Sequence, residues 1–239
     1  MNRLQAEWLR LYLPAGVRDP DAGTALSDGQ GQLRALVIEV SKPAEWDALA
    51  AVWRGVQDEL GLPPPGIAVS GTDGLQLWFS LAETVSATRG AAFLAGLRRR
   101  YLAGVAGPRV RLCPDEAAPQ CRAALVPSQQ PETGNWSAFV APGLAPVFAD
   151  TPWLDVPPGI DGQADLLARL ECIKPEDFDK ALRGLREAAP SPAAPTPQPA
   201  RPAGDVDPRR FLQQVLNDEG APLALRVEAA KALLPHTPM

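Results

Sequence analysis

Two short apolar runs of the sequence carry polar residues of the types that bind metal ions, bases or phosphate. Glu39 ends the apolar run 35–38, and Gln76 and Trp78 alternate with leucine and phenylalanine in residues 75–81. A carboxylate binds divalent cations, an amide hydrogen-bonds base edges, and an indole offers a face on which a base stacks. These residue types indicate a nucleotide or nucleic-acid site, provided that the fold brings the two runs together.

Arginines are more clustered than the overall charge suggests. The net charge is −5 and the pI is near 5.0, which argues against a protein that coats nucleic acid through bulk positive charge. Three arginines are consecutive at 98–100, and Arg109 and Arg111 share one face of a strand by alternation. With Arg122 they can line a groove that binds phosphate, although a solvated arginine cluster is the competing interpretation.

Several chemistries are excluded by the residues that the chain lacks. His236, near the C-terminus, is the single histidine, so a Ser-His-Asp triad or an internal Cys-His pair cannot form. The three cysteines, at 113, 121 and 172, show no C-x-x-C spacing, which disfavours a structural zinc site. We expect these cysteines to be small, buried apolar side chains.

Residues 32–113 show the patterns of alternating strands and helices. β-branched runs with alternation indicate strands, and apolar steps of three and four indicate helices. The expected elements, in chain order, are a strand at 32–40, a helix at 46–60, strands at 67–70 and 75–81, a helix capped by Ser86, and a strand at 109–113.

This β-α-β-β-α-β order predicts an α+β fold with a ferredoxin-like or RRM-like core. In that topology the first and third strands are central neighbours, and helices cover one sheet face. Alternation then places Leu36, Ile38 and Val40 toward the helices, with Glu39 on the opposite, open face. Gln76, Trp78 and Ser80 are expected beside Glu39.

Three segments together resemble the catalytic core of the archaeo-eukaryotic primases, or primase-polymerases. They are residues 37–41 (VIEVS), 60–62 (LGL) and 70–79 (SGTDGLQLWF), and the resemblance covers about residues 32 to 115. It implies a core elaborated as in primase-polymerases. In that family a carboxylate pair on the first strand and a later acid hold divalent metal, and a histidine on the third strand contacts the nucleotide.

This sequence departs from the family pattern at most of those positions. Glu39 matches the first carboxylate, but Ser41 occupies the position of its partner and Gln76 occupies the position of the histidine. At the position of the later acid the sequence offers only Cys113 or, after Pro114, Asp115. The resemblance therefore implies a dismantled nucleotidyl-transfer centre, with Glu39 and Asp115 as the remaining catalytic candidates and Glu39 as the candidate ligand of Mg²⁺ or Mn²⁺. The candidate residues for binding nucleotide or nucleic acid are Ser70, Gln76, Trp78, Arg109, Arg111 and Arg122.

Each candidate also has a purely structural interpretation. Glu39 fits a solvated carboxylate at a strand end, and the segment 70–74 fits a plain hairpin turn better than a phosphate cradle, because Asp73 would repel an anion. Gln76 and Trp78 are expected under a layer from residues 114–187, whose aromatic residues are Trp136, Phe139, Phe148 and Trp153.

Proline at nearly every second position in 188–204 predicts an extended linker between two parts of the chain. Residues 1–187 form the expected α+β domain. Residues 205–239 form an expected αα-hairpin that resembles a segment of small-terminase-like phage proteins. Such a hairpin has too little core to be stable alone, so we expect it to dock on its own chain, a second copy or a protein partner.

Together these features predict a catalytically degenerate primase-polymerase-like accessory factor that binds DNA or nucleotides in replication or processing of a phage or mobile element. An active metal-dependent primase, with Glu39, Asp115 and Asp73 or Glu116 as ligands, is one alternative. A protein-interaction scaffold without nucleic-acid binding is the other. The sequence shows no run of about 18 apolar residues and no signal peptide, so a cytoplasmic protein without membrane contact is expected.

Overall fold

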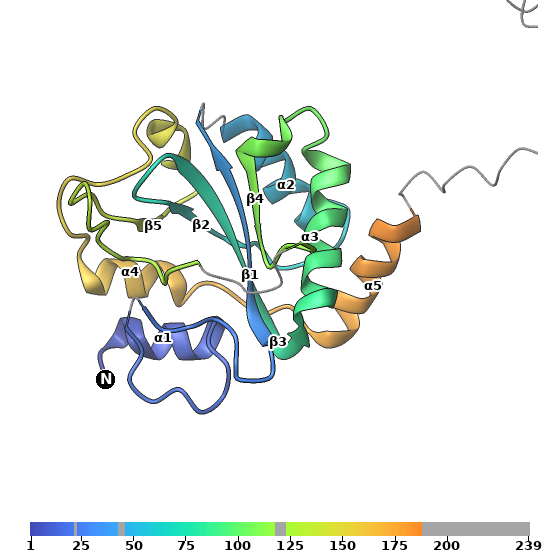
Figure 1. Cartoon of the computed structure of the whole chain (residues 1–239), viewed down its shortest axis with the longest axis horizontal. Helices are drawn as coiled ribbons and strands as arrows, with labels where there is room; N and C mark the ends of the chain where they lie inside the picture. Colours follow the sequence, from blue (N-terminus) through green and yellow to red (C-terminus); the bar gives the residue numbers. More distant parts are fainter. Residues whose placement is uncertain (22, 43–45, 118–122, 188–239) are drawn as a thin grey trace, which may run out of the picture. The chain divides into compact units, whose positions relative to one another are not determined.

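A five-stranded antiparallel sheet forms the centre of the protein (Figure 1). The computed structural model describes residues 1–21, 23–42, 46–117 and 123–187. Its strands are β1 (Gln32–Ser41), β2 (Gly66–Val69), β3 (Gly74–Ser86), β4 (Val110–Cys113) and β5 (Ala138–Val140), in the spatial order β4-β1-β3-β2-β5. The α+β class is confirmed, and β1 and β3 are the predicted neighbours.

The helices are α1 (Arg3–Leu11), α2 (Trp46–Asp58), α3 (Ala87–Tyr101), α4 (Ile160–Leu167) and α5 (Pro175–Glu187), with short 3-10 turns η1 (Gly107–Arg109) and η2 (Ala145–Phe148). The helices predicted at 46–60 and after Ser86 are present as α2 and α3, and three further described helices lie outside residues 32–113. Ser86 caps α3, because its hydroxyl accepts the Arg89 amide. Near the N-terminus, α1 begins with a capping box between Asn2 and Gln5.

The two faces of the sheet divide as alternation predicts. Leu36, Ile38 and Val40 belong to a core that includes α2, α3 and α5 residues. Ala35 and Val37 belong to a second core with α1 and α4 residues. The second face is therefore covered, and the predicted open face is wrong for most of its area. Its cover comes partly from Phe139, as expected, and partly from the unpredicted α1.

Two of the three cysteines lie in the described residues. Cys172 is a half-buried free thiol and Cys113 is half-buried and disulfide-bonded, so the expectation of small, buried apolar side chains is wrong for both. Within the described ranges, no helix is long and apolar enough to span a bilayer. The chain divides into two compact units, Met1–Ser191 and Pro192–Met239. The predicted linker and C-terminal hairpin lie outside the described residues.

Candidate functional site

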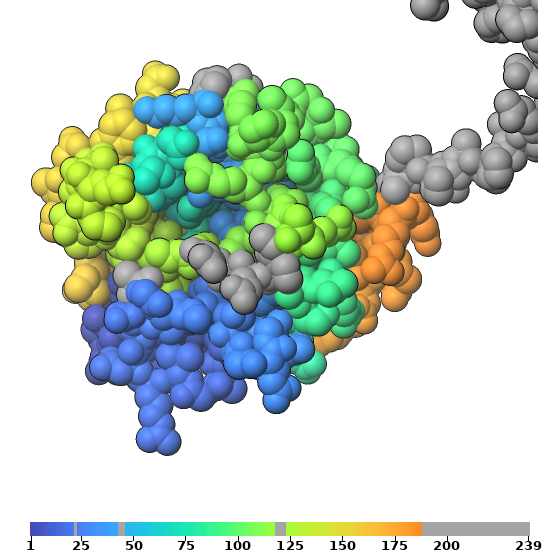
Figure 2. Space-filling view, in the orientation of Figure 1, coloured from blue at the N-terminus to red at the C-terminus, as the bar shows by residue number. Residues whose placement is uncertain are grey.

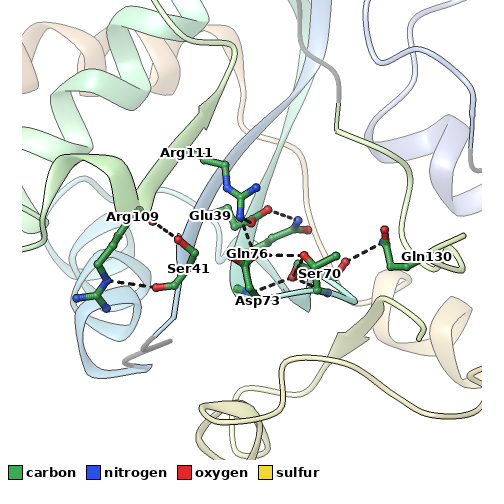
Figure 3. A network of polar contacts seen from close by, with 10 residues as sticks. Glu39, Ser41, Ser70, Asp73, Gln76, Arg109, Arg111 and Gln130 are labelled. Carbon is green, nitrogen blue, oxygen red and sulfur yellow. Dashed lines mark hydrogen bonds and ion pairs between the residues drawn. The ribbon is translucent and has the colours of Figure 1, made fainter. Parts of the chain in front are cut away.

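Strand register brings Glu39 and Gln76 together at the centre of the sheet. Glu39 of β1 is paired with Gln76 of β3 and with Arg111 of β4. Residues directly opposite in an antiparallel sheet point to the same face, so the three side chains meet. The Gln76 amide donates to Glu39 Oε2 at 2.7 Å (Figure 3). The pairing of an acid and an amide that alternation predicted is thus present.

Trp78 fixes the orientation of that amide. Its indole Nε1 donates to Gln76 Oε1 at 2.8 Å, which turns the amide nitrogen of Gln76 toward Glu39. The indole packs edge-on against Tyr12 and Phe139, with ring centroids 5.2 and 5.9 Å away, and is 1% exposed. It has no surface on which a base can stack. Trp78 acts here by holding Gln76 rather than by contacting a base.

Arg111 joins two carboxylates through one nitrogen. Its Nη2 lies 2.7 Å from Asp73 Oδ1, to which it donates a hydrogen bond, and 2.8 Å from Glu39 Oε1. Glu39 Oε1 is buried and accepts no hydrogen bond, so its contact with Arg111 is an ion pair of poor hydrogen-bond geometry. The Arg111 side chain is 56% exposed, whereas that of Glu39 is 14% exposed.

Burial dominates the electrostatics of Glu39. Loss of solvent raises the pKa of this carboxyl, and the nearby Asp73 carboxylate raises it further. The hydrogen bond from Gln76 and the Arg111 charge lower the pKa, but they do not outweigh burial. Glu39 is therefore not the solvated strand-end carboxylate of the structural interpretation.

Gly74 makes room for the Glu39 side chain. A Cβ on Gly74 would lie 2.9 Å from both Glu39 Cγ and the Val40 carbonyl oxygen. The first of these contacts involves a side chain that could move, but the second involves backbone in a paired strand. The Glu39 side chain thus lies against a backbone position where only glycine fits without a shift.

The turn between β2 and β3 uses its own backbone donors. Ser70 Oγ accepts the amides of Thr72 and Gly74, the Ser70 amide donates to Gly74 O, and the Gly71 amide donates to Pro152 O. These amides are not available to a phosphate, which supports the hairpin-turn interpretation. Ser70 shapes the turn that contains Asp73.

The ion pair of Asp73 with Arg111 could not be predicted from the sequence, because it depends on how this turn lies beside β4.

Arg109 interacts with β1 beyond the Glu39 cluster. Its Nε donates to Ser41 O at 3.3 Å, and Ser41 Oγ donates to Arg109 O at 3.2 Å. Figure 3 shows its guanidinium directed away from Glu39 and Arg111. Arg109, at the end of η1, and Arg111 of β4 therefore do not converge on one point, and Arg122 lies outside the described residues.

Asp115 lies away from Glu39 along the sheet. Because β4 runs antiparallel to β1, Cys113 is opposite Val37, and Asp115 follows beyond that end. Its Oδ1 accepts the Ala117 amide at 2.8 Å. Asp73 precedes Gly74, which pairs with Ser41 at the other end of β1. In the part of the chain that the structure describes, no three metal-ligating side chains gather, so these residues do not fit a divalent-metal centre.

The surface is hollowed near the middle of the view in Figure 2, between green atoms of the β4 region and yellow-green atoms that follow position 123. A hollow of about 670 Å³ lies at the end of α3, and its lining includes Arg98, Arg99, Asp115 and Glu116. Asp115 thus belongs to a different surface from Glu39.

Comparison with solved structures gives weak structural likeness. No protein-family model matches the chain, and no curated protein sequence does. Among solved structures, the chain is similar to the polymerase domain of Ligase D from Mycobacterium tuberculosis, determined in complex with DNA. The likeness has a TM-score of 0.38 and 21% identity, and it covers 61% of this chain and 57% of that one. At these values it carries no inference about activity.

Proposed function

We propose that the chain is a nucleic-acid-binding accessory protein that keeps a phosphate-binding arginine but no nucleotidyl-transfer centre. The observation that carries this proposal is the state of Arg111. Its Nη2 is anchored between Glu39 and Asp73, and no described residue accepts a hydrogen bond from its Nε or Nη1. A guanidinium that is oriented by carboxylates and still has donors to spare is suited to a phosphate.

The arrangement of Glu39 supports loss of catalysis. Two-metal phosphoryl transfer needs several carboxylates that converge on the same phosphate. Glu39 instead accepts from Gln76 and pairs with Arg111, and Asp115 lies along the sheet from it. A cation at Glu39 would have to displace a positive charge that is already there. The active, Mg²⁺- or Mn²⁺-dependent alternative is for this reason the less favoured one.

The wider role rests on the sequence resemblance. We propose that the protein acts in the cytoplasm in replication or processing of phage or mobile-element DNA, with residues 205–239 as the contact to a partner or to a second copy. The scaffold alternative keeps that contact but gives the sheet no ligand.

Binding of a labelled single-stranded oligonucleotide, followed by fluorescence anisotropy over a range of salt concentrations, tests the proposal. Arg111→Ala is expected to weaken binding and to reduce the salt slope by about 0.7, the value for one lost phosphate contact on a single strand. Arg111→Lys keeps the charge and should recover part of the affinity.

Arg183→Ala is the matched control, because Arg183 is exposed on α5, against the opposite face of the sheet. It should leave both the affinity and the salt slope unchanged. Wild-type binding by a folded Arg111→Ala protein, or no binding by the wild type, would contradict the proposal and favour the scaffold.

A primer-extension assay with Mg²⁺ or Mn²⁺ tests the proposed loss of catalysis. We expect no incorporation of nucleotides. Incorporation that disappears in Glu39→Ala would overturn the degenerate interpretation and restore the polymerase alternative.

A further inference from the structure

A groove of about 540 Å³ lies between the start of α1, the start of α4 and the segment that precedes β5. Two tryptophans and four prolines form most of its walls: Trp8, Trp136, Pro20, Pro127, Pro157 and Pro158. Ile160, the first residue of α4, adds an apolar side chain that is 50% exposed. Aromatic-lined grooves of this kind bind proline-rich segments in the polyproline II conformation.

Both tryptophans are held in place by hydrogen bonds. Trp8 Nε1 donates to Val126 O at 2.8 Å, which fixes the indole beside the residue that precedes Pro127. The backbone of Trp136 is paired with Leu154, since the Trp136 amide donates to Leu154 O at 2.8 Å and the Leu154 amide donates to Trp136 O at 3.0 Å. The groove is therefore preformed, which lowers the entropic cost of binding.

The indole of Trp136 has a hydrogen-bond donor to spare. Its side chain is half-buried, and none of the described residues accepts a hydrogen bond from its Nε1. A polyproline II chain forms no internal hydrogen bonds, so its backbone carbonyl groups are free acceptors. Because an indole N–H that becomes buried usually finds a partner, a carbonyl of such a chain is a suitable acceptor for Trp136.

Charge complementarity favours one occupant of this groove. Among the described residues of the lining, Asp21 alone is charged. Its Oδ1 accepts from the Gly23 amide and the Thr24 hydroxyl, and no described arginine or lysine forms an ion pair with it. Residues 188–204 contain six prolines and a single charged residue, Arg201. One negative charge in the groove thus matches one positive charge in that segment.

The described structure ends on the sheet face opposite to the groove. The helix α5, which ends at Glu187, packs in the core that contains α2 and α3 residues, whereas Trp8 of α1 belongs to the other core together with α4 residues. Figure 1 shows α5 to the right of β1, and α1 and α4 to its left. A second copy of the chain can place its residues 188–204 in the groove without leading them round the edge of the sheet.

From the aromatic groove, the spare indole donor and the matching charges we infer that the groove binds residues 188–204 of a second copy of this chain in the polyproline II conformation. Prolines of the segment lie against Trp8 and Trp136, a backbone carbonyl accepts from Trp136 Nε1, and Arg201 pairs with Asp21. This contact is independent of the nucleic-acid proposal, which concerns Arg111 on β4.

A labelled synthetic peptide of residues 188–204, titrated with the full chain and followed by fluorescence anisotropy, tests the inference. We expect saturable binding. The same peptide with its six prolines replaced by alanine should bind at least about tenfold more weakly, because it loses the preformed conformation and the contacts with the indole rings.

Trp136→Phe keeps an aromatic ring and removes the donor. It should weaken the proline-rich peptide about two- to tenfold, the range expected for one hydrogen bond. Trp53→Phe is the matched control, because Trp53 of α2 packs against the other core, and it should leave the affinity unchanged.

Asp21→Asn tests the charge pairing. It should weaken the peptide about two- to fivefold, the range expected for an exposed ion pair. It should not change the affinity for a peptide that carries Arg201→Ala, because that peptide has no charge to pair.

Sedimentation of the full chain over a range of concentrations tests whether a second copy supplies the segment. The mean mass of the wild type should rise with concentration more steeply than that of Trp136→Ala. The same dependence in both proteins, as expected if each chain fills its own groove, would overturn the inference. It is also overturned if the peptide does not bind saturably, if the alanine peptide binds equally well, if Trp136→Phe and Trp53→Phe have the same effect, or if Asp21→Asn weakens both peptides equally.

Discussion

Glu39 is the residue whose environment differs most from its sequence pattern. A carboxylate at the end of a strand is usually solvated, but this one is only 14% exposed and relies on one hydrogen bond and one ion pair. Buried ion pairs compensate desolvation only in part, so the charged form of Glu39 is disfavoured by its own site.

The raised pKa of Glu39 gives a pH dependence with a definite sign. Because the pKa of Glu39 is higher in the folded than in the unfolded protein, protonated Glu39 favours the folded state. This contribution to the unfolding free energy is fully present below the ordinary pKa of 4.5 and is lost as pH rises through the folded pKa. The unfolding free energy of the wild type, relative to Glu39→Gln, should therefore fall with rising pH above about 4.5. Its slope is at most about 1.4 kcal/mol per pH unit, the value for one proton.

Urea unfolding of both proteins at a series of pH values measures this difference. Glu83→Gln, which removes an exposed carboxylate from β3, is the control. The unfolding free energy of the wild type relative to Glu83→Gln should not fall with rising pH. If the unfolding free energy of the wild type, relative to Glu39→Gln, rises with pH, the predicted direction of the pH dependence is wrong.

Among the elements, β5 is an edge strand whose outer side is occupied by a side chain. Gln163 of α4 accepts the Phe139 amide at 2.7 Å and donates to the Phe139 carbonyl at 3.0 Å. The amide side chain thus takes the two hydrogen bonds that a neighbouring strand would make. Covering an edge in this way protects a sheet from pairing with another chain.

Gln163→Ala should destabilise the protein by about 1–3 kcal/mol, because it leaves two buried backbone groups without partners. Urea unfolding measures the loss, and amide hydrogen exchange at Phe139 should become faster. Gln129→Ala removes a single, exposed hydrogen bond to Gly134 O and should cost much less. Equal losses in the two variants would mean that the β5 edge gains nothing from Gln163.

At the scale of the whole molecule, the described residues build two extensive cores. The α2–α3–α5 core extends to Leu185, and the α1–α4 core ends earlier, at Cys172. From the extent of these cores we expect residues 1–187 to fold without residues 205–239.

Removing residues 192–239 should leave the Tm of the remaining unit within about 2 °C of wild type, since less than about 1 kcal/mol is lost. Calorimetry measures the Tm, and light scattering measures the mass. If residues 205–239 join two copies, the full chain has a multiple of the mass expected for one chain and the shortened chain does not. An unchanged state of association would rule out self-association through this segment.

Local patterns are sufficient for the order of elements from β1 to β4. Alternation in 32–40 and 75–81, helical spacing in 46–60 and the Ser86 cap depend on near neighbours in the chain, and each predicts an element that the structure contains. Alternation also places Glu39 and Gln76 on one face, because strand period and antiparallel pairing fix direction. The helix α1 is absent from the prediction, although its buried residues Leu4, Trp8 and Leu11 have helical spacing.

The surroundings of the Glu39–Gln76 pair follow from tertiary packing and not from local pattern. The α+β class, the central strands and the meeting of an acid with an amide can all be read from the sequence alone. The cover over Trp78, the Arg111 bridge to Asp73, the separation of Asp115 from Glu39 and the partnerless Tyr12 hydroxyl each join segments far apart in the chain. Such contacts depend on how loops and layers pack, for which local periodicity carries no signal.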